Sequence, residues 1–161
     1  MGLCAASGAH SAITEIFLLD VDHCTGGCLP NAADNVTMTQ NASALDCLVN
    51  LFGGDEFKST TSGQHEALAF NIDKSTINLS KLTGSDFTLV SSSEGSQQQD
   101  GLGNFNYLIS SSKTGDTMMS FEIANIGFSD ITSNSLGNFF EVDLFSGANG
   151  NCGPNGCQVT P

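Results

Sequence analysis

The sequence predicts an all-β protein: an antiparallel two-sheet β-sandwich of jelly-roll type, with a closed β-barrel as the alternative. Three observations favour this fold class. Apolar residues recur mostly with period two, in short runs typical of strands. Glycine, Asn, Asp and Ser separate these runs at the places where hairpins need turns. No stretch requires a long helix, and short strands at this spacing are typical of a sandwich or a barrel.

The individual strands follow from this alternation. Leu68, Phe70 and Ile72 would share one face of a strand, and Ile77 and Leu79 alternate in the same way. In chain order, we expect strands near residues 13–21, 35–40, 45–52, 66–72, 76–82, 87–91, 105–110, 118–126 and 139–145. The polar run 91–100 is expected to be an exposed loop.

The 161 residues suffice for one domain with an ordinary core and are too few for two. We expect the sandwich over residues 13–146 and a disulfide-pinned tail over residues 147–161. Residues 1–12 could be a signal-peptide remnant, because Ala9-His10-Ser11 has the small-x-small form that a signal peptidase accepts. No apolar run reaches the ~18 residues that a membrane span needs.

The charge of the chain argues against nucleic acid as a partner. Seventeen acidic residues stand against four basic ones, which gives a formal net charge of -13. Such a chain repels phosphate backbones and anionic membrane surfaces.

Six cysteines in so short a chain favour an oxidising compartment and disulfides. Cys24-Thr-Gly-Gly-Cys28 and Cys152-Gly-Pro-Asn-Gly-Cys157 each enclose glycine-rich turns, so we expect two local disulfides. A zinc site with four cysteine ligands is the alternative, although structural zinc sites prefer gaps of two residues between paired cysteines. Cys4 and Cys47 could pair with each other. If Cys4 belongs to a signal peptide, Cys47 is a buried thiol.

A calcium site is the metal hypothesis that the sequence offers. Asp20 and Asp22 would place two carboxylates on one face where the first strand ends, and the loop from Asp100 to Asn104 supplies further oxygen atoms. Carboxylate and carbonyl oxygens are the ligands that calcium prefers. Solvated acids near turns are the competing interpretation.

Catalysis has weak support in the sequence. His65-Glu66 lacks the second histidine of a zinc-protease motif and begins an expected strand, so we interpret the pair as structural. A hydrolase using Glu66 or Asp143 is a minor hypothesis. The chain has no tryptophan and a single tyrosine, Tyr107, to stack against a sugar.

The order of several short motifs resembles bacterial exported proteins that carry a PEP-CTERM sorting tail. The motifs are Cys24-Thr-Gly-Gly-Cys28, Val36-Thr-Met-Thr-Gln-Asn41, Ser62-Gly-Gln-His-Glu-Ala-Leu-Ala-Phe-Asn71, Leu82-Thr-Gly-Ser-Asp-Phe-Thr-Leu-Val90, Asp100-Gly-Leu-Gly-Asn-Phe-Asn-Tyr107, Met119-Ser-Phe-Glu-Ile123 and Asn138-Phe-Phe-Glu-Val-Asp143. The resemblance covers nearly the whole chain. The sorting tail itself, Val-Pro-Glu-Pro with an apolar helix and a basic end, does not follow Pro161 in this sequence.

This resemblance implies export, recognition by an exosortase-type enzyme through the missing tail, and a surface or matrix role with exopolysaccharide in biofilm or floc formation. It brings no catalytic residues. We therefore expect a non-catalytic extracellular or cell-surface bacterial protein whose partner is exopolysaccharide or another copy of itself. The alternatives are a calcium-dependent carbohydrate-binding module and a subunit of an extracellular filament, which an exposed edge strand could build.

Overall fold

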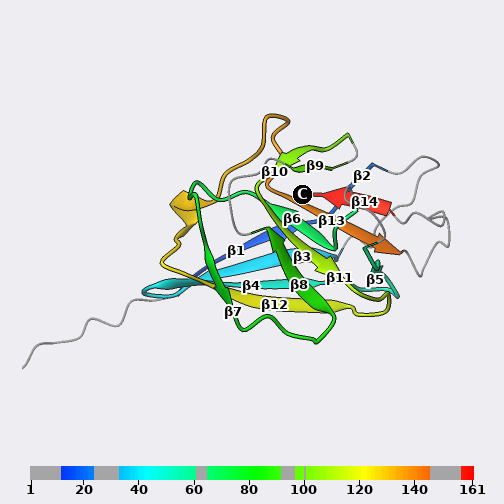
Figure 1. Cartoon of the computed structure of the whole chain (residues 1–161), viewed down its shortest axis with the longest axis horizontal. Coiled ribbons are helices and arrows are strands. Elements are labelled where there is room, and N and C mark those ends of the chain that lie inside the picture. The colour runs from blue at the N-terminus through cyan, green and yellow to red at the C-terminus, as the bar shows by residue number, and fades with distance from the viewer. Residues whose placement is uncertain (1–11, 24–32, 61–64, 92–96, 100, 146–156) are drawn as a thin grey trace, which may run out of the picture.

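The computed structural model describes residues 12–23, 33–60, 65–91, 97–99, 101–145 and 157–161. These residues form antiparallel sheets that pack face to face, as Figure 1 shows, and the sheets are not closed into a barrel. The predicted all-β class and the two-sheet sandwich are thereby confirmed.

The first sheet has five strands, and one of its edges is long. Its spatial order is β1 (Ile13–Leu18), β3 (Asn35–Gln40), β4 (Ala44–Asn50), β12 (Met118–Ala124) and β7 (Asn78–Ser80). Every neighbouring pair is antiparallel, and β3 and β4 form a hairpin through Asn41. Because β1 pairs with β3 alone among the described strands, it is an edge strand.

The second sheet has seven strands. Its spatial order is β2 (Val21–Asp22), β14 (Cys157–Thr160), β13 (Phe140–Phe145), β6 (Leu68–Phe70), β11 (Tyr107–Ser111) and β8 (Phe87–Ser91), with β5 (Glu56–Phe57) also paired to β13. Strand β5 lies on the same side of β13 as β6: β6 pairs with the start of β13 and β5 pairs with its end. Strand β14 runs along the opposite side of β13.

The main core fills the space between the two sheets. Alternate residues of each strand point into it, as the period-two pattern predicts, and Leu68, Phe70 and Ile72 all belong to it. The ring of Phe70 on β6 stacks on Phe121 of β12 with centroids 5.7 Å apart, so this pair joins the two sheets. Ile77 and Leu79 are partly buried against the same core.

A smaller cluster covers the outer face of the second sheet. The hairpin of β9 (Gln97–Gln99) and β10 (Gly103–Phe105) lies over this face, at the top of Figure 1. Leu102 and Phe105 of this hairpin pack against Ala69 and Leu108, which point outward from β6 and β11. The second sheet is therefore buried on both faces over part of its area. A single turn of 3-10 helix, η1 (Phe128–Asp130), follows β12.

Three local predictions were wrong. The run 91–100 was expected to be a loop, but Gln97–Gln99 forms β9 and Gln99 is fully buried. The tail expected over residues 147–161 contains β14, which lies inside the second sheet, so the domain extends beyond residue 146. The strand expected over 13–21 ends at Leu18, because the chain crosses to the second sheet at the buried Leu19.

Candidate functional site

A cluster of buried ionisable side chains lies on the outer side of β13. Glu141 and Asp143 are two residues apart on this strand, so both carboxyls lie on one face, and both are fully buried. Val142 and Leu144, which alternate with them, point into the main core. Acidic residues are almost never fully buried without a partner. This pair of carboxyls therefore calls for a physical explanation.

Within the described residues, the carboxyl oxygens of Glu141 and Asp143 have no hydrogen-bond partner. The nearest basic groups are the Nζ of Lys58, 4.0 Å from Asp143 Oδ2, and the Nδ1 of His65, 3.4 Å from the same oxygen. Glu66 adds a third buried carboxyl, and its Oε2 accepts a hydrogen bond of 3.1 Å from Thr60 Oγ1. We call Lys58, His65, Glu66, Glu141 and Asp143 the buried cluster.

Burial shifts the protonation of all three carboxyls toward the neutral acid. It raises the pKa of Asp143 to about 8; the charge of Lys58 opposes this rise and that of Glu66 adds to it. Burial, then the charges of Asp143 and Glu66, raise the pKa of Glu141 well above its usual range. Burial also raises the pKa of Glu66, against the hydrogen bond from Thr60. At neutral pH the cluster therefore holds protons that ordinary carboxyls would have released.

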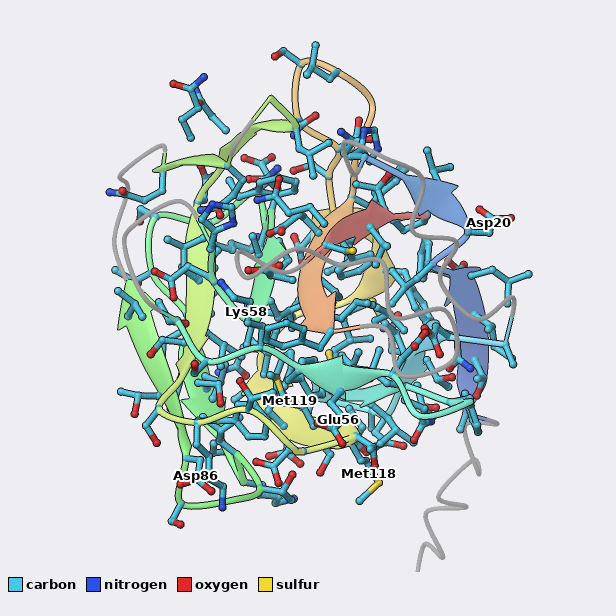
Figure 2. All side chains as sticks on the ribbon, turned by 90° about the vertical axis from the view of Figure 1, so that its right-hand side faces the viewer. Asp20, Glu56, Lys58, Asp86, Met118 and Met119 are labelled. Atoms are coloured by element: carbon cyan, nitrogen blue, oxygen red, sulfur yellow. The ribbon has the colours of Figure 1, made fainter. Side chains whose placement is uncertain are left out.

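Backbone hydrogen bonds hold Lys58 against β13. The N–H of Lys58 donates to the carbonyl of Asp143 at 3.1 Å, directly after the pairing of β5 with β13. Two residues on, the N–H of Thr60 donates to the carbonyl of Ser111 at 2.8 Å, and its Oγ1 accepts from the N–H of Ser111 at 3.1 Å. Figure 2 shows Lys58 among the interior side chains, whereas Asp20 and Asp86 lie at the periphery.

The predicted hydrolase residues Glu66 and Asp143 do lie in one cluster, together with His65. His65 and Glu66 were expected to begin a strand, but β6 begins only at Leu68 and both residues precede it. Carboxyls with raised pKa values suit acid–base chemistry. None of the cluster residues lines the surface depression described below.

The calcium ligands suggested by the sequence are not seen together. Asp20 is exposed in the link between β1 and β2, and Asn104 is exposed on β10. The side chain of Asp22 and the whole of Asp100 lie outside the described residues. Within the described ranges, no three His, Cys, Asp or Glu side chains are placed to hold a metal ion. The calcium site therefore stays a prediction.

The cysteines are described only in part. Cys157 on β14 is disulfide-bonded. Cys47 on β4 is a free, buried thiol, so the suggested pairing of Cys47 with Cys4 is wrong and the alternative of a buried thiol holds. Its side chain belongs to the main core between the sheets. The predictions for Cys4, Cys24, Cys28 and Cys152 fall outside the described residues.

The outer face of the first sheet is the second candidate surface. A depression of about 490 Å³ lies on it, and its lining combines the outward-facing Leu48 with polar side chains: Thr37, Thr39, Asp46, Lys81, Ser120 and Glu122, together with Cys47 and Phe121 of β4 and β12. Beside it, the edge strand β1 exposes Ile13, Ile16 and Leu18. No helix within the described part of the chain is long and apolar enough to cross a membrane.

Sequence reasoning missed Lys58 and Glu141. A usable signal was present for Glu141, because Glu141-Val-Asp143 puts two acids on one face of a strand that is otherwise apolar. No pattern signals Lys58, which is distant in sequence and reaches Asp143 only through the pairing of β5 with β13.

Comparisons of this chain with protein-family models, with curated proteins and with solved structures give no match.

Proposed function

We propose that this chain is a non-catalytic, exported structural protein of the bacterial cell surface or extracellular matrix that associates with copies of itself through the edge of its first sheet. The observation that carries the proposal is the edge strand β1. It has six residues, pairs with β3 on one side, and leaves its other side without a described strand. An unpaired edge presents backbone N–H and C=O groups to a second strand.

The side chains of β1 favour pairing over protection. Ile13, Ile16 and Leu18 are 59, 62 and 48% exposed, and Glu15 is the single charged residue of the strand. Soluble proteins commonly protect such an edge with charges, with proline or by making it short. The edge strands β2 and β7 are short, with two and three residues. The remaining edge strand, β8 of the second sheet, has five residues, so β1 with six is the longest edge of the described sheets and the one we assign to a neighbouring copy.

Export has independent support from Cys157. Its disulfide is typical of proteins in oxidising compartments, and the net charge of -13 keeps a protein soluble outside the cell. The matrix setting with exopolysaccharide comes from the resemblance described above.

The test is the oligomeric state of the purified chain by sedimentation velocity over a range of concentrations. The unaltered chain is expected to form dimers or larger species, and Ile16→Lys, which adds a charge to the edge, is expected to shift it to monomer. Leu136→Lys is the matched control, because Leu136 is also 62% exposed but lies in a turn outside any strand. A chain that stays monomeric at every concentration, or equal effects of the two substitutions, would refute self-association through β1.

Polysaccharide binding is a second candidate, favoured by the depression on the first sheet. The hydroxyls of Thr37, Thr39 and Ser120 lie beside the charged groups of Asp46 and Glu122 there, and such groups exchange hydrogen bonds with sugar hydroxyls.

Co-sedimentation with bacterial exopolysaccharide, with and without calcium, tests this second function. Leu48→Lys places a bulky charge in the depression and is expected to abolish binding, whereas Leu136→Lys should leave it unchanged. Absence of binding in both conditions excludes the candidate.

A further inference from the structure

Lys58 differs from the other lysines of the chain in its surroundings. Lys74, Lys81 and Lys113 are 46, 70 and 60% exposed, and each lies 2.5–2.8 Å from a carboxylate oxygen. These ion pairs raise the pKa of all three amines and keep them as unreactive ammonium ions. The side chain of Lys58 is 3% exposed. Its neighbour Asp143 is fully buried, and Asp143 Oδ2 lies 4.0 Å from Lys58 Nζ.

This buried pair is poorly satisfied as an ion pair. Among the described residues, neither oxygen of Asp143 has a hydrogen-bond partner, although His65 Nδ1 lies 3.4 Å from Oδ2, and burial of two charges without such bonds costs more free energy than their attraction returns. Burial raises the pKa of Asp143 to about 8 and so favours its neutral carboxylic acid, the form whose Cγ an amine can attack.

An amine beside a carboxylic acid, both buried and held together, is a reactive arrangement. The backbone already fixes the two residues side by side, because Lys58 N–H donates to the Asp143 carbonyl at 3.1 Å. Holding reactants in one geometry removes most of the entropic barrier to their reaction. Exclusion of water also disfavours the reverse hydrolysis.

We propose that Lys58 and Asp143 join through an intramolecular isopeptide bond that forms without another enzyme. The lone pair of Lys58 Nζ attacks Cγ of Asp143, the Nζ–Cγ bond forms, and the bond from Cγ to its hydroxyl oxygen breaks. One proton leaves Nζ and joins the departing hydroxyl, so the chain loses one water molecule. No oxidant, reductant or cofactor takes part.

Two other carboxyls of the buried cluster, Glu66 and Glu141, interact electrostatically with Asp143, and among the described residues the oxygens of Glu141 have no hydrogen-bond partner. Such a carboxyl would accept the proton from Nζ on one oxygen and give a proton to the leaving oxygen from the other. It would act as general base and general acid at once.

The product explains two features of the cluster. The amide replaces two buried ionisable groups by one neutral group, whose burial costs less free energy. It also ties the residue after β5 to β13 covalently, where β5 itself contributes only two residues of pairing. The proposal is independent of self-association through β1.

The test is the intact mass of the folded full-length chain after reduction of its disulfides. We expect a mass below the sequence mass by one water, and a branched proteolytic peptide that joins residues 58 and 143 and lacks trypsin cleavage after Lys58. Lys58→Met and Asp143→Ala are expected to restore the full mass. Lys113→Met is the matched control and should keep the deficit, because its closer pair with Asp86 is exposed.

Any of three results would refute the proposed bond. These are a full sequence mass for the unaltered chain, a water loss that persists in Lys58→Met, and a water loss that maps to other residues. If Lys58→Met and Asp143→Ala fail to fold, the branched peptide of the unaltered chain decides alone, since its presence supports the bond and its absence refutes it.

Discussion

The hydroxyl of Tyr107 donates a hydrogen bond of 2.5 Å to the backbone carbonyl of Lys74. Tyr107 is fully buried on β11, and Lys74 lies in the turn after β6. The ring of Tyr107 stacks on Phe70 with centroids 5.6 Å apart. One side chain thus combines core packing with a polar contact that holds a turn in place.

Tyr107→Phe is expected to lower the free energy of unfolding by about 1–2 kcal/mol, because the ring still packs while the carbonyl of Lys74 loses its donor. Urea unfolding followed by circular dichroism measures this. Thr14→Val is the control: its hydroxyl pairs with Thr39 on the exposed face, so its effect should stay below about 0.5 kcal/mol. An equal loss in both variants would contradict the expectation.

Stability is expected to fall as pH rises. An unfolded chain releases the protons of Glu66 and Glu141 near their ordinary pKa of 4.5, but the folded chain holds them to higher pH. Above about pH 5, and until the folded chain releases these protons, the unfolded state therefore binds fewer protons, and each such carboxyl lowers the free energy of unfolding by up to about 1.4 kcal/mol per pH unit. These two groups titrate whether or not Lys58 and Asp143 are joined.

Melting temperatures measured from about pH 5 upward, for the unaltered chain and for Glu141→Gln, test this decline of stability with pH. The substitution removes one titrating group and should flatten the decline, whereas Glu15→Gln on the exposed strand β1 should leave the slope unchanged. A melting temperature that rises with pH would show that the cluster is not protonated in the folded state.

Alanine should be tolerated at Gly101 better than at Gly103. Both glycines have positive φ, at 85° and 96°, so both variants lose about 1 kcal/mol through backbone strain. A Cβ at Gly103 would lie 2.7 Å from Nδ2 of Asn134, which donates to the carbonyl of Leu102 at 2.8 Å; a Cβ at Gly101 meets nothing. We expect Gly103→Ala to cost about 1 kcal/mol more in urea unfolding. Equal costs would show that Asn134 moves aside freely.

Cys47 is expected to resist alkylation in the folded chain. Burial, and secondarily the charge of Asp46, raise the pKa of its thiol, and the thiolate is the form that reacts. Iodoacetamide at about pH 8 should label Cys47 in urea and leave it unlabelled without urea, as read by peptide mass spectrometry. Labelling in the folded chain would mean that β4 opens locally.

The fold class and most strands were predictable, because each long strand carries alternating apolar residues that the core accepts. Strand β9 was not predictable, since its three glutamines show no alternation and are ordered by pairing with β10. Strand β14 was missed because only Cys157 and Val159 alternate in it, next to a Gly- and Asn-rich run that resembles a loop.

The buried cluster was predictable only in part. Glu66 and Asp143 stood out as acids in apolar strands, but their proximity depends on which strands become neighbours. Lys58 reaches Asp143 because β5 takes the place beside β13 where β6 has ended. Such tertiary contacts leave no trace in local periodicity.

The crossing of the chain at Leu19, from β1 in one sheet to β2 in the other, bears on the kinetics of folding. Strand β3 meets β4 across the turn at residues 41–43, whereas β2 pairs with β14 from the other end of the chain: His23 and Thr160, which are in contact, are 137 residues apart in sequence. Closing so large a loop is slow. The β3–β4 hairpin is therefore expected to form early, and docking of residues 21–22 to be the late step that joins the two sheets along one side.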